Sequence, residues 1–201
     1  VLNHEVPSSA SSAVEQLKKF DHVILACGVR PRNPKIPGQD LPHVHYYDRF
    51  IREKIKPGKN VVIIGAGGIG VDTATAVLEY GSDIDKNPEH FMKHWGIDPK
   101  QRSGLIPGFK PEKPETKITL LQRSQGGVGR GLGKTTGWIH RLELKRMGVK
   151  SIVGIQYDKI TPDGLWIIKK DETKELIPAD QIILCAGQES ENALDAILSA
   201  A

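Results

Sequence analysis

The sequence VVIIGAGGIG, at residues 61–70, decides the fold. Four consecutive apolar residues lead into three glycines with the spacing Gly65-x-Gly67-x-x-Gly70. A continuous apolar run of this kind is typical of a parallel strand that is buried on both faces. The next residues, VDTATAVLEYG, predict a helix with one apolar face that ends at Gly81. The stretch therefore predicts a strand, a tight glycine turn and a helix.

Each glycine of this turn has its own physical role. Gly65 allows a sharp turn off the strand, Gly67 lets a pyrophosphate approach the backbone, and Gly70 lets the helix pack close to the strand. The N–H groups at the start of the helix then face the phosphates with partial positive charge. An apolar strand before the motif and a helix after it favour dinucleotide binding over a structural glycine turn without a ligand. The residues expected to contact the dinucleotide are Gly65, Ala66, Gly67, Gly68, Ile69 and Gly70.

The end of the next apolar strand, KITLLQRSQ, predicts which dinucleotide is bound. In an NAD-binding unit this strand ends near an acidic residue that binds the ribose 2′-hydroxyl. Here Arg123 and Ser124 stand in that place, and a guanidinium can hold a 2′-phosphate through a bidentate, charge-assisted contact. We therefore expect NADPH rather than NADH; the alternative is that Arg123 is an ordinary surface arginine. The assignment rests on strand order, because a proline-rich insertion at residues 82–116 separates the two motifs.

A second glycine-rich loop, GRGLGKTTGW, spans residues 129–138. Its GKT resembles the end of a P-loop, but that motif would need a glycine where Val128 stands. Two interpretations are open. The loop lines the cofactor cleft with Arg130 and Lys134 near the phosphates, or its role is purely structural.

The remaining reactive residues do not form a recognisable catalytic or metal site. His90 and His94 have the spacing of zinc ligands on one helix face, but the sequence offers no evident third ligand. We expect them to be ordinary histidines, and we expect Trp138 to pack in the core. Cys27 and Cys185 lack metal-site spacing, and we expect them to be reduced core thiols rather than a disulfide.

Several other segments have clear local signals. HVILACG at residues 22–28 predicts another buried parallel strand. VRPRNPKIPG follows it, and its prolines exclude a helix or a central strand and predict an extended crossover. SAVEQLKKF and EHFMKHWG predict short helices, and DRFIREK predicts a short helix or a linker. Pro162-Asp163-Gly164 predicts a hairpin turn.

Composition excludes some classes of protein and weakens others. The chain of 201 residues, 38% of them hydrophobic, can form one sizeable domain and parts of another. It contains no apolar run of roughly 20 residues and no signal-peptide pattern, so we expect a cytoplasmic protein without a membrane partner. The net charge of +4 leaves nucleic-acid binding as an alternative. That alternative is disfavoured because basic residues are dispersed and only 5% of residues are aromatic.

Taken together, the motifs resemble those of flavoproteins that bind two nucleotides. ILACGVRPRNPKIPG resembles the segment that leaves an FAD domain for an NAD(P)H domain, and IILCAGQES resembles the return. The combination of GAGGIGVDTA, FMKHWGID, LLQRS, GLGKTTGWIHR and CAGQE is similar to the C-terminal region of bacterial NADPH-dependent 2,4-dienoyl-CoA reductases. The resemblance covers essentially all 201 residues.

This resemblance implies an α/β fold, in which a Rossmann-like, three-layer NAD(P)-binding domain is inserted in part of an FAD-binding domain. The implied boundaries are a partial FAD-binding domain at 1–40, an inter-domain crossover at 41–58, an NADPH-binding domain at 59–180 and a return segment to the FAD-binding domain at 181–201.

The resemblance also implies cofactors and partners. Full proteins of that family carry a (β/α)₈ barrel with FMN and the substrate site, a 4Fe-4S cluster, and the FAD and NADPH domains. A hydride passes from NADPH to FAD, and electrons then move singly through the cluster to FMN, which reduces 2,4-dienoyl-CoA in unsaturated fatty acid β-oxidation. The chain would be a fragment whose partners are NADP(H), the remaining FAD domain and the barrel.

The same resemblance assigns residues. Arg123 and Ser124 would hold NADP, although the family often has a basic residue where Ser124 stands. Ala26, Cys27 and Gly28 would lie along FAD in a partial site, with Cys27 replacing the more common Thr or Ser. No catalytic or metal-binding residue is expected in this chain.

Other functions stay open from the sequence. The chain also fits an NAD(P)-binding module of another flavin-dependent oxidoreductase, such as an amine dehydrogenase, or a non-enzymatic nucleotide-sensing module. A disulfide reductase would need a redox C-x-x-C, which the sequence lacks.

Overall fold

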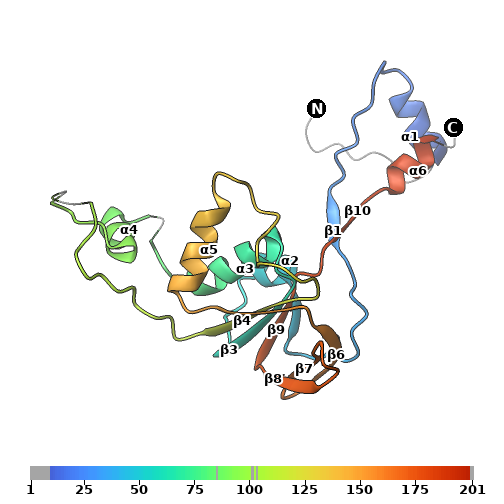
Figure 1. The fold of residues 1–201 in the computed structure, drawn as a ribbon. Coiled ribbons are helices and arrows are strands. Elements are labelled where there is room, and N and C mark those ends of the chain that lie inside the picture. The colour runs from blue at the N-terminus through green and yellow to red at the C-terminus, as the bar shows by residue number, and fades with distance from the viewer. Residues whose placement is uncertain (1–9, 85, 101, 103, 200–201) are drawn as a thin grey trace. The chain divides into compact units, whose positions relative to one another are not determined.

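The computed structural model describes residues 10–84, 86–100, 102 and 104–199 (Figure 1). The chain forms two compact units, one of residues 1–32 with 188–201 and one of residues 33–187. None of the described helices is long and apolar enough to cross a bilayer.

The smaller unit consists of two helices and a two-stranded ribbon. Its ribbon is antiparallel, and its two helices, one from each end of the chain, contact each other (Figure 1). The first helix confirms the prediction from SAVEQLKKF. The elements are α1 (Ala10–Leu17), β1 (Val29–Pro31), β10 (Gln188–Ser190) and α6 (Ala193–Ser199).

The prediction of a buried strand at residues 22–28 is wrong. This segment is a coil with exposed side chains, and Ile24 is 90% exposed. A strand is held by hydrogen bonds to a neighbouring strand, and no described strand pairs with these residues. This apolar segment therefore lacks the hydrogen bonds to a neighbouring strand that would make it part of a sheet.

The larger unit is built on a five-stranded parallel sheet with the strand order β2-β9-β3-β4-β5. The order confirms an α/β fold with a parallel, Rossmann-like sheet. Its strands are β2 (Val44–Tyr46), β3 (Asn60–Ile64), β4 (Lys117–Gln122), β5 (Lys150–Val153) and β9 (Gln181–Leu184).

Different layers cover the two faces of this sheet. Alternate residues of a strand point to opposite faces, so Val61 and Ile63 pack in one core with the helices, while Val62 and Ile64 pack in another. The second core lies against an antiparallel sheet in which Thr161 and Gly164 close the predicted hairpin. The covering elements are α2 (Tyr47–Arg52), α3 (Gly68–Leu78) and α5 (Gly137–Arg146) on one face, and β6 (Gln156–Thr161), β7 (Gly164–Ile168) and β8 (Lys174–Pro178) on the other.

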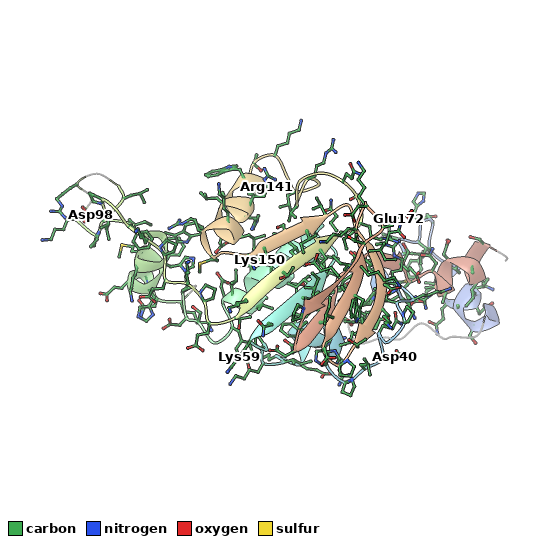
Figure 2. The ribbon with its side chains drawn as sticks, turned by 60° about the horizontal axis from the view of Figure 1, so that its bottom comes forward. Asp40, Lys59, Asp98, Arg141, Lys150 and Glu172 are labelled. Atoms are coloured by element: carbon green, nitrogen blue, oxygen red, sulfur yellow. The ribbon has the colours of Figure 1, made fainter. Side chains whose placement is uncertain are left out.

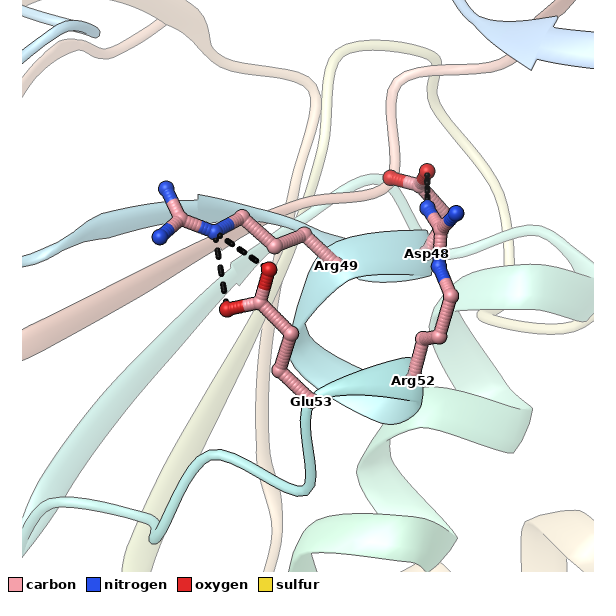
Figure 3. A network of polar contacts seen from close by, with 4 residues as sticks. All are labelled: Asp48, Arg49, Arg52 and Glu53. Atoms are coloured by element: carbon pink, nitrogen blue, oxygen red, sulfur yellow. Dashed lines mark hydrogen bonds and ion pairs between the residues drawn. The ribbon is translucent and has the colours of Figure 1, made fainter.

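Helix α2 is short, and its exposed surface carries two ion pairs one turn apart (Figure 3). Arg49 pairs with Glu53, and Arg52 pairs with Asp48, at 3.0 and 2.7 Å. Exposed pairs of this spacing contribute only about 0.3–0.5 kcal/mol each. Burial of Phe50, which is 3% exposed, therefore does more to hold α2 on the sheet.

The insertion between α3 and β4 has local structure of its own. It contains α4 (Pro88–Trp95), whose N-cap residue Asn87 accepts hydrogen bonds from two backbone N–H groups through its side chain. Gly96 ends the helix in the left-handed conformation. At the C-terminal end of the insertion, the Thr116 hydroxyl donates to the Gly58 carbonyl at 3.0 Å. The insertion is therefore attached at its root to the chain that enters β3.

Candidate nucleotide-binding site

The first glycine of the turn lies where three adjacent strands end. The Gly65 N–H donates to the Leu121 carbonyl of β4 at 2.9 Å, and a Cβ on Gly65 would lie 2.2 Å from the Cys185 carbonyl beyond β9. Its φ of +111° also strains any other residue. A side chain at this position is therefore excluded by the neighbouring backbone as well as by the turn itself.

The other two glycines differ in what surrounds them. A Cβ on Gly70 would lie 1.8 Å from the Gly65 carbonyl oxygen, so the helix and the turn meet in backbone contact. Around Gly67, in contrast, no described atom lies within 4 Å of the position of a Cβ. Gly67 is also the N-cap of α3, and no side chain caps the helix. The N–H groups of the first helical turn have no partner within the helix, so this open space fits a phosphate.

The second glycine-rich loop lies against the first one. The Gly129 N–H donates to the Ala66 carbonyl at 3.0 Å, and Arg141 of α5, labelled in Figure 2, donates to the Gly129 carbonyl at 3.2 Å. Leu132 packs on the helix-side core beside Gly68. The second loop therefore packs against the glycine turn and supports it.

The two cations of this second loop lie in solvent. Arg130 and Lys134 are exposed, and they form no ion pair among the described residues. The two glycine-rich loops therefore contact each other. Contact of Arg130 and Lys134 with phosphates stays a prediction.

Arg123 and Ser124 directly follow β4, beside the strand that ends at the glycine turn. Leu121 of β4 pairs with Ile64 of β3, so both motifs lie at the carboxyl edge of the parallel sheet. Arg123 and Ser124 are exposed, and the Ser124 carbonyl accepts a hydrogen bond from the Gly154 N–H at 3.3 Å. The structure therefore brings the glycine turn and Arg123 to adjacent strand ends.

A tyrosine near this edge was missed by sequence reasoning. Tyr157 of β6 donates its hydroxyl to the Leu121 carbonyl at 3.3 Å. Burial raises the pKa of Tyr157 to about 12, against a smaller lowering by the charge of Arg123. The phenol is therefore neutral at physiological pH and contributes a polar wall near Arg123. No local sequence signal points to it, because it lies in a different sheet.

The residues assigned to FAD lie in the smaller unit. Ala26, Cys27 and Gly28 form an exposed coil before β1, and the Gly28 carbonyl accepts a hydrogen bond from the Glu191 N–H at 3.0 Å. The prediction that both cysteines are core thiols is wrong for Cys27, which is exposed; Cys185 is buried, and both are free.

We expect the two thiols to react with Ellman's reagent at very different rates. Burial raises the pKa of Cys185 to about 12, while its contact with the Thr73 hydroxyl opposes this shift. A thiol is nucleophilic only as the thiolate. One thiol should therefore react in the native protein, and the second only in denaturant. The Cys27→Ser variant should lose the native reaction, and equal rates for both thiols would contradict the buried position of Cys185.

His90, His94 and Trp138 lie apart from the glycine turn and the end of β4. His90 pairs with Asp83, and His94 Nε2 lies 3.4 Å from Glu143 Oε1 of α5. Among the described residues, no three potential ligands are grouped to hold a metal ion. The prediction that Trp138 packs in the core is wrong, because its side chain is 57% exposed. It lies in the first turn of α5, whose buried side chains are Glu143 and Leu144.

A glycine turn between a buried parallel strand and a helix N-terminus defines a dinucleotide-binding α/β protein of the Rossmann type. The family model for the pyridine nucleotide-disulphide oxidoreductases matches residues 4–199. The chain therefore belongs to the pyridine nucleotide-disulphide oxidoreductase family, whose members are oxidoreductases that bind FAD and NAD(P)H.

Individual relatives match most of this chain but only part of their own length. A metal reductase of Desulforamulus reducens is 31% identical over 189 residues, which cover 94% of this chain and 27% of the relative. The structure of a 2-naphthoyl-CoA reductase matches with a TM-score of 0.63 and 22% identity, over 86% of this chain and 21% of that one.

An amine oxidase of Pseudomonas geniculata N1 that acts on 6-hydroxypseudooxynicotine matches with a TM-score of 0.65 and 20% identity, over 96% of this chain and 25% of its own. At these identities the two solved structures support the fold alone. The chain spans about a quarter of the length of these three relatives.

Proposed function

We propose that this chain is the NADPH-binding module of a flavin-dependent oxidoreductase that reduces an unsaturated acyl-CoA, specifically a 2,4-dienoyl-CoA. The observation that carries the proposal is the position of Arg123. It follows the strand next to the one that ends in the glycine turn, and no acidic residue stands at that strand end. This arrangement favours a dinucleotide with a 2′-phosphate.

The residues of the site have separate roles in this proposal. The N–H groups of the first turn of α3 donate to the pyrophosphate, with the helix dipole adding favourable charge. The bare backbone at Gly67 leaves the space for it. Arg123 holds the 2′-phosphate by a bidentate contact, and Ser124 adds a hydroxyl or N–H donor. The protein thus positions the nicotinamide end by binding the opposite end of the cofactor.

FAD supplies a hydride acceptor when it is bound. Ala26, Cys27 and Gly28 lie in an exposed coil, and Gly28 has a left-handed φ of +81°. The exposed backbone fits contacts along a cofactor through N–H and carbonyl groups. In the proposed assignment, residues 1–40 and 181–201 belong to the FAD-binding domain, 41–58 to the crossover and 59–180 to the NADPH-binding domain. Of these, residues 33–40 and 181–187 lie in the larger compact unit, where β9 pairs with β3 in the parallel sheet. The remaining FAD domain is a partner, and the protein is cytoplasmic.

The acyl-CoA substrate is supported by the motif combination GAGGIGVDTA, FMKHWGID, LLQRS, GLGKTTGWIHR and CAGQE. A structural neighbour that is named as a 2-naphthoyl-CoA reductase fits the same substrate class. By this resemblance, the barrel, the FMN and the 4Fe-4S cluster belong to the whole protein. A second candidate is a metal reductase module, because the relative of that name shares 31% identity across nearly the whole chain.

The cofactor assignment is tested by titrating the chain with NADPH and NADH in a calorimeter. A charged contact to one arginine contributes about 1.5–3 kcal/mol, so we expect NADPH to bind roughly ten- to a hundredfold tighter than NADH. Arg123→Ala should remove this preference and leave NADH binding unchanged. Arg49→Ala, which removes an exposed arginine of α2, is the matched control. Equal binding of both nucleotides by the wild type would refute the assignment.

The substrate assignment needs the full-length protein. With NADPH as donor, we expect 2,4-dienoyl-CoA to be reduced faster than ferric iron. Faster reduction of ferric iron would favour the second candidate.

A further inference from the structure

An apolar groove lies between α5 and the insertion, apart from the glycine turn. Its volume is about 760 Å³, and none of its lining residues belongs to the glycine turn or the end of β4. Volumes of about 300–1,000 Å³ are usual for sites that hold small organic ligands. We call it the α4–α5 groove, and its defining residues are Phe91, Trp95, Phe109, Trp138, Leu142 and Arg146.

The walls of the groove are fixed by several contacts. Gly96 turns the chain after α4, and a Cβ there would lie 2.3 Å from the Phe109 ring, so Phe109 lies directly on this turn. The Ile106 N–H donates to the Gly96 carbonyl at 2.8 Å. Beside the groove, His94 of α4 meets Glu143 of α5, and both side chains are almost buried, at 12% and 10% exposed. The insertion is thereby held against α5.

Large apolar side chains in the groove are open to solvent. Phe91 and Leu142 are 45% and 42% exposed, and Trp138 is more exposed still. Exposed aromatic and aliphatic side chains that are gathered in one groove indicate a binding surface rather than a random distribution.

One cation is held inside these apolar walls. The Arg146 guanidinium lies 5.4 Å from the centre of the Trp95 ring and 5.6 Å from that of the Phe109 ring. Cation–π contacts of this length orient a guanidinium and remove part of its hydration. No carboxylate of the described residues lies within ion-pair distance of it, and the other lining residues are uncharged. Asp98 at the tip of the insertion (Figure 2) already pairs with Arg102.

We propose that the α4–α5 groove binds an apolar monocarboxylate, with its chain or ring on Trp138 and Leu142 and its carboxylate on Arg146. The negative charge of the ligand is inferred from Arg146, which is a single oriented guanidinium without an ion-pair partner among the described residues. A guanidinium of this kind can bind a carboxylate through two parallel hydrogen bonds. A polyphosphate would need further donors that the lining lacks. The proposal is independent of the nucleotide assignment, because the two sites share no residue.

The test uses decanoate as the ligand and decanol as its uncharged match. Trp95 and Trp138 lie in the groove, so binding should change tryptophan fluorescence, and calorimetry gives the affinity. We expect decanoate to bind about ten- to a hundredfold tighter than decanol, as one charge-assisted contact predicts. Arg146→Gln should remove the difference, while Lys145→Gln, which removes the neighbouring exposed charge outside the groove, should retain it. NADPH affinity should be unchanged in both variants.

A second variant tests the apolar wall of the groove. Trp138→Ala, at an exposed position, should weaken both ligands and retain the melting temperature. Equal binding of decanoate and decanol, or equal loss in Arg146→Gln and Lys145→Gln, would overturn the proposal. Self-association of the wild type that Trp138→Ala abolishes, without decanoate binding, would assign the groove to a second copy of the chain instead.

Discussion

Gly70→Ala is expected to lower the free energy of unfolding by about 3 kcal/mol or more. The new Cβ would lie 1.8 Å from the Gly65 carbonyl oxygen, which is backbone and cannot move like the end of a flexible side chain. Either α3 must shift off the sheet or the turn must open. For a domain of this size, the loss corresponds to a fall in melting temperature of roughly 6–12 °C.

Thermal unfolding followed by circular dichroism at 222 nm measures this effect. The matched control is Gly67→Ala, which adds the same methyl group three residues earlier, in extended backbone with no described atom within 4 Å of the new Cβ. The control should melt with the wild type. If Gly70→Ala also melts with the wild type, the close contact between helix and turn is incorrect.

Gly67→Ala is expected to have the opposite profile: unchanged stability and greatly weakened NADPH binding. The space that the methyl group enters is the space proposed for the pyrophosphate. Losing about two charge-assisted hydrogen bonds, each contributing roughly 1.5 kcal/mol, would weaken binding on the order of a hundredfold.

Calorimetry with NADPH and with adenosine 2′-monophosphate separates the two parts of the site. The smaller ligand has the 2′-phosphate but no pyrophosphate, so Gly67→Ala should bind it as well as the wild type does. Arg123→Ala should weaken both ligands. If Gly67→Ala weakens neither, the open space before α3 does not hold the pyrophosphate, and the glycine turn has only a structural role.

The core of the fold could be predicted because its signals are local. The apolar run before Gly65, the glycine spacing and the helix after it need no information from elsewhere in the chain, and the structure confirms a strand, turn and helix there. Residues 22–28 carry an equally apolar signal, yet they form a coil. A strand depends on hydrogen bonds to a neighbour, so an apolar pattern alone cannot establish it.

The candidate site could be predicted only in part. Strand order was enough to expect Arg123 beside the glycine turn, because parallel strands end at the same edge of a sheet. The hydrogen bond from Gly129 to Ala66 and the position of Tyr157 depend on how distant segments pack. Trp138 was misassigned for a related reason, since α5 buries Leu144 and Glu143 against its neighbours and leaves the tryptophan on its outer side.

The insertion is attached at the end of the sheet opposite to the glycine turn, which affects how the sequence of such a protein can change in evolution. The insertion enters β4 at the amino end of the strand, where Lys117 lies opposite Asn60, and Thr116 fastens it to Gly58. The glycine turn and Arg123 lie at the carboxyl ends of the same strands. A segment of different length or sequence could therefore be grafted between α3 and Thr116 without changing strand register or the nucleotide edge, so the two ends of one sheet can evolve separate specificities.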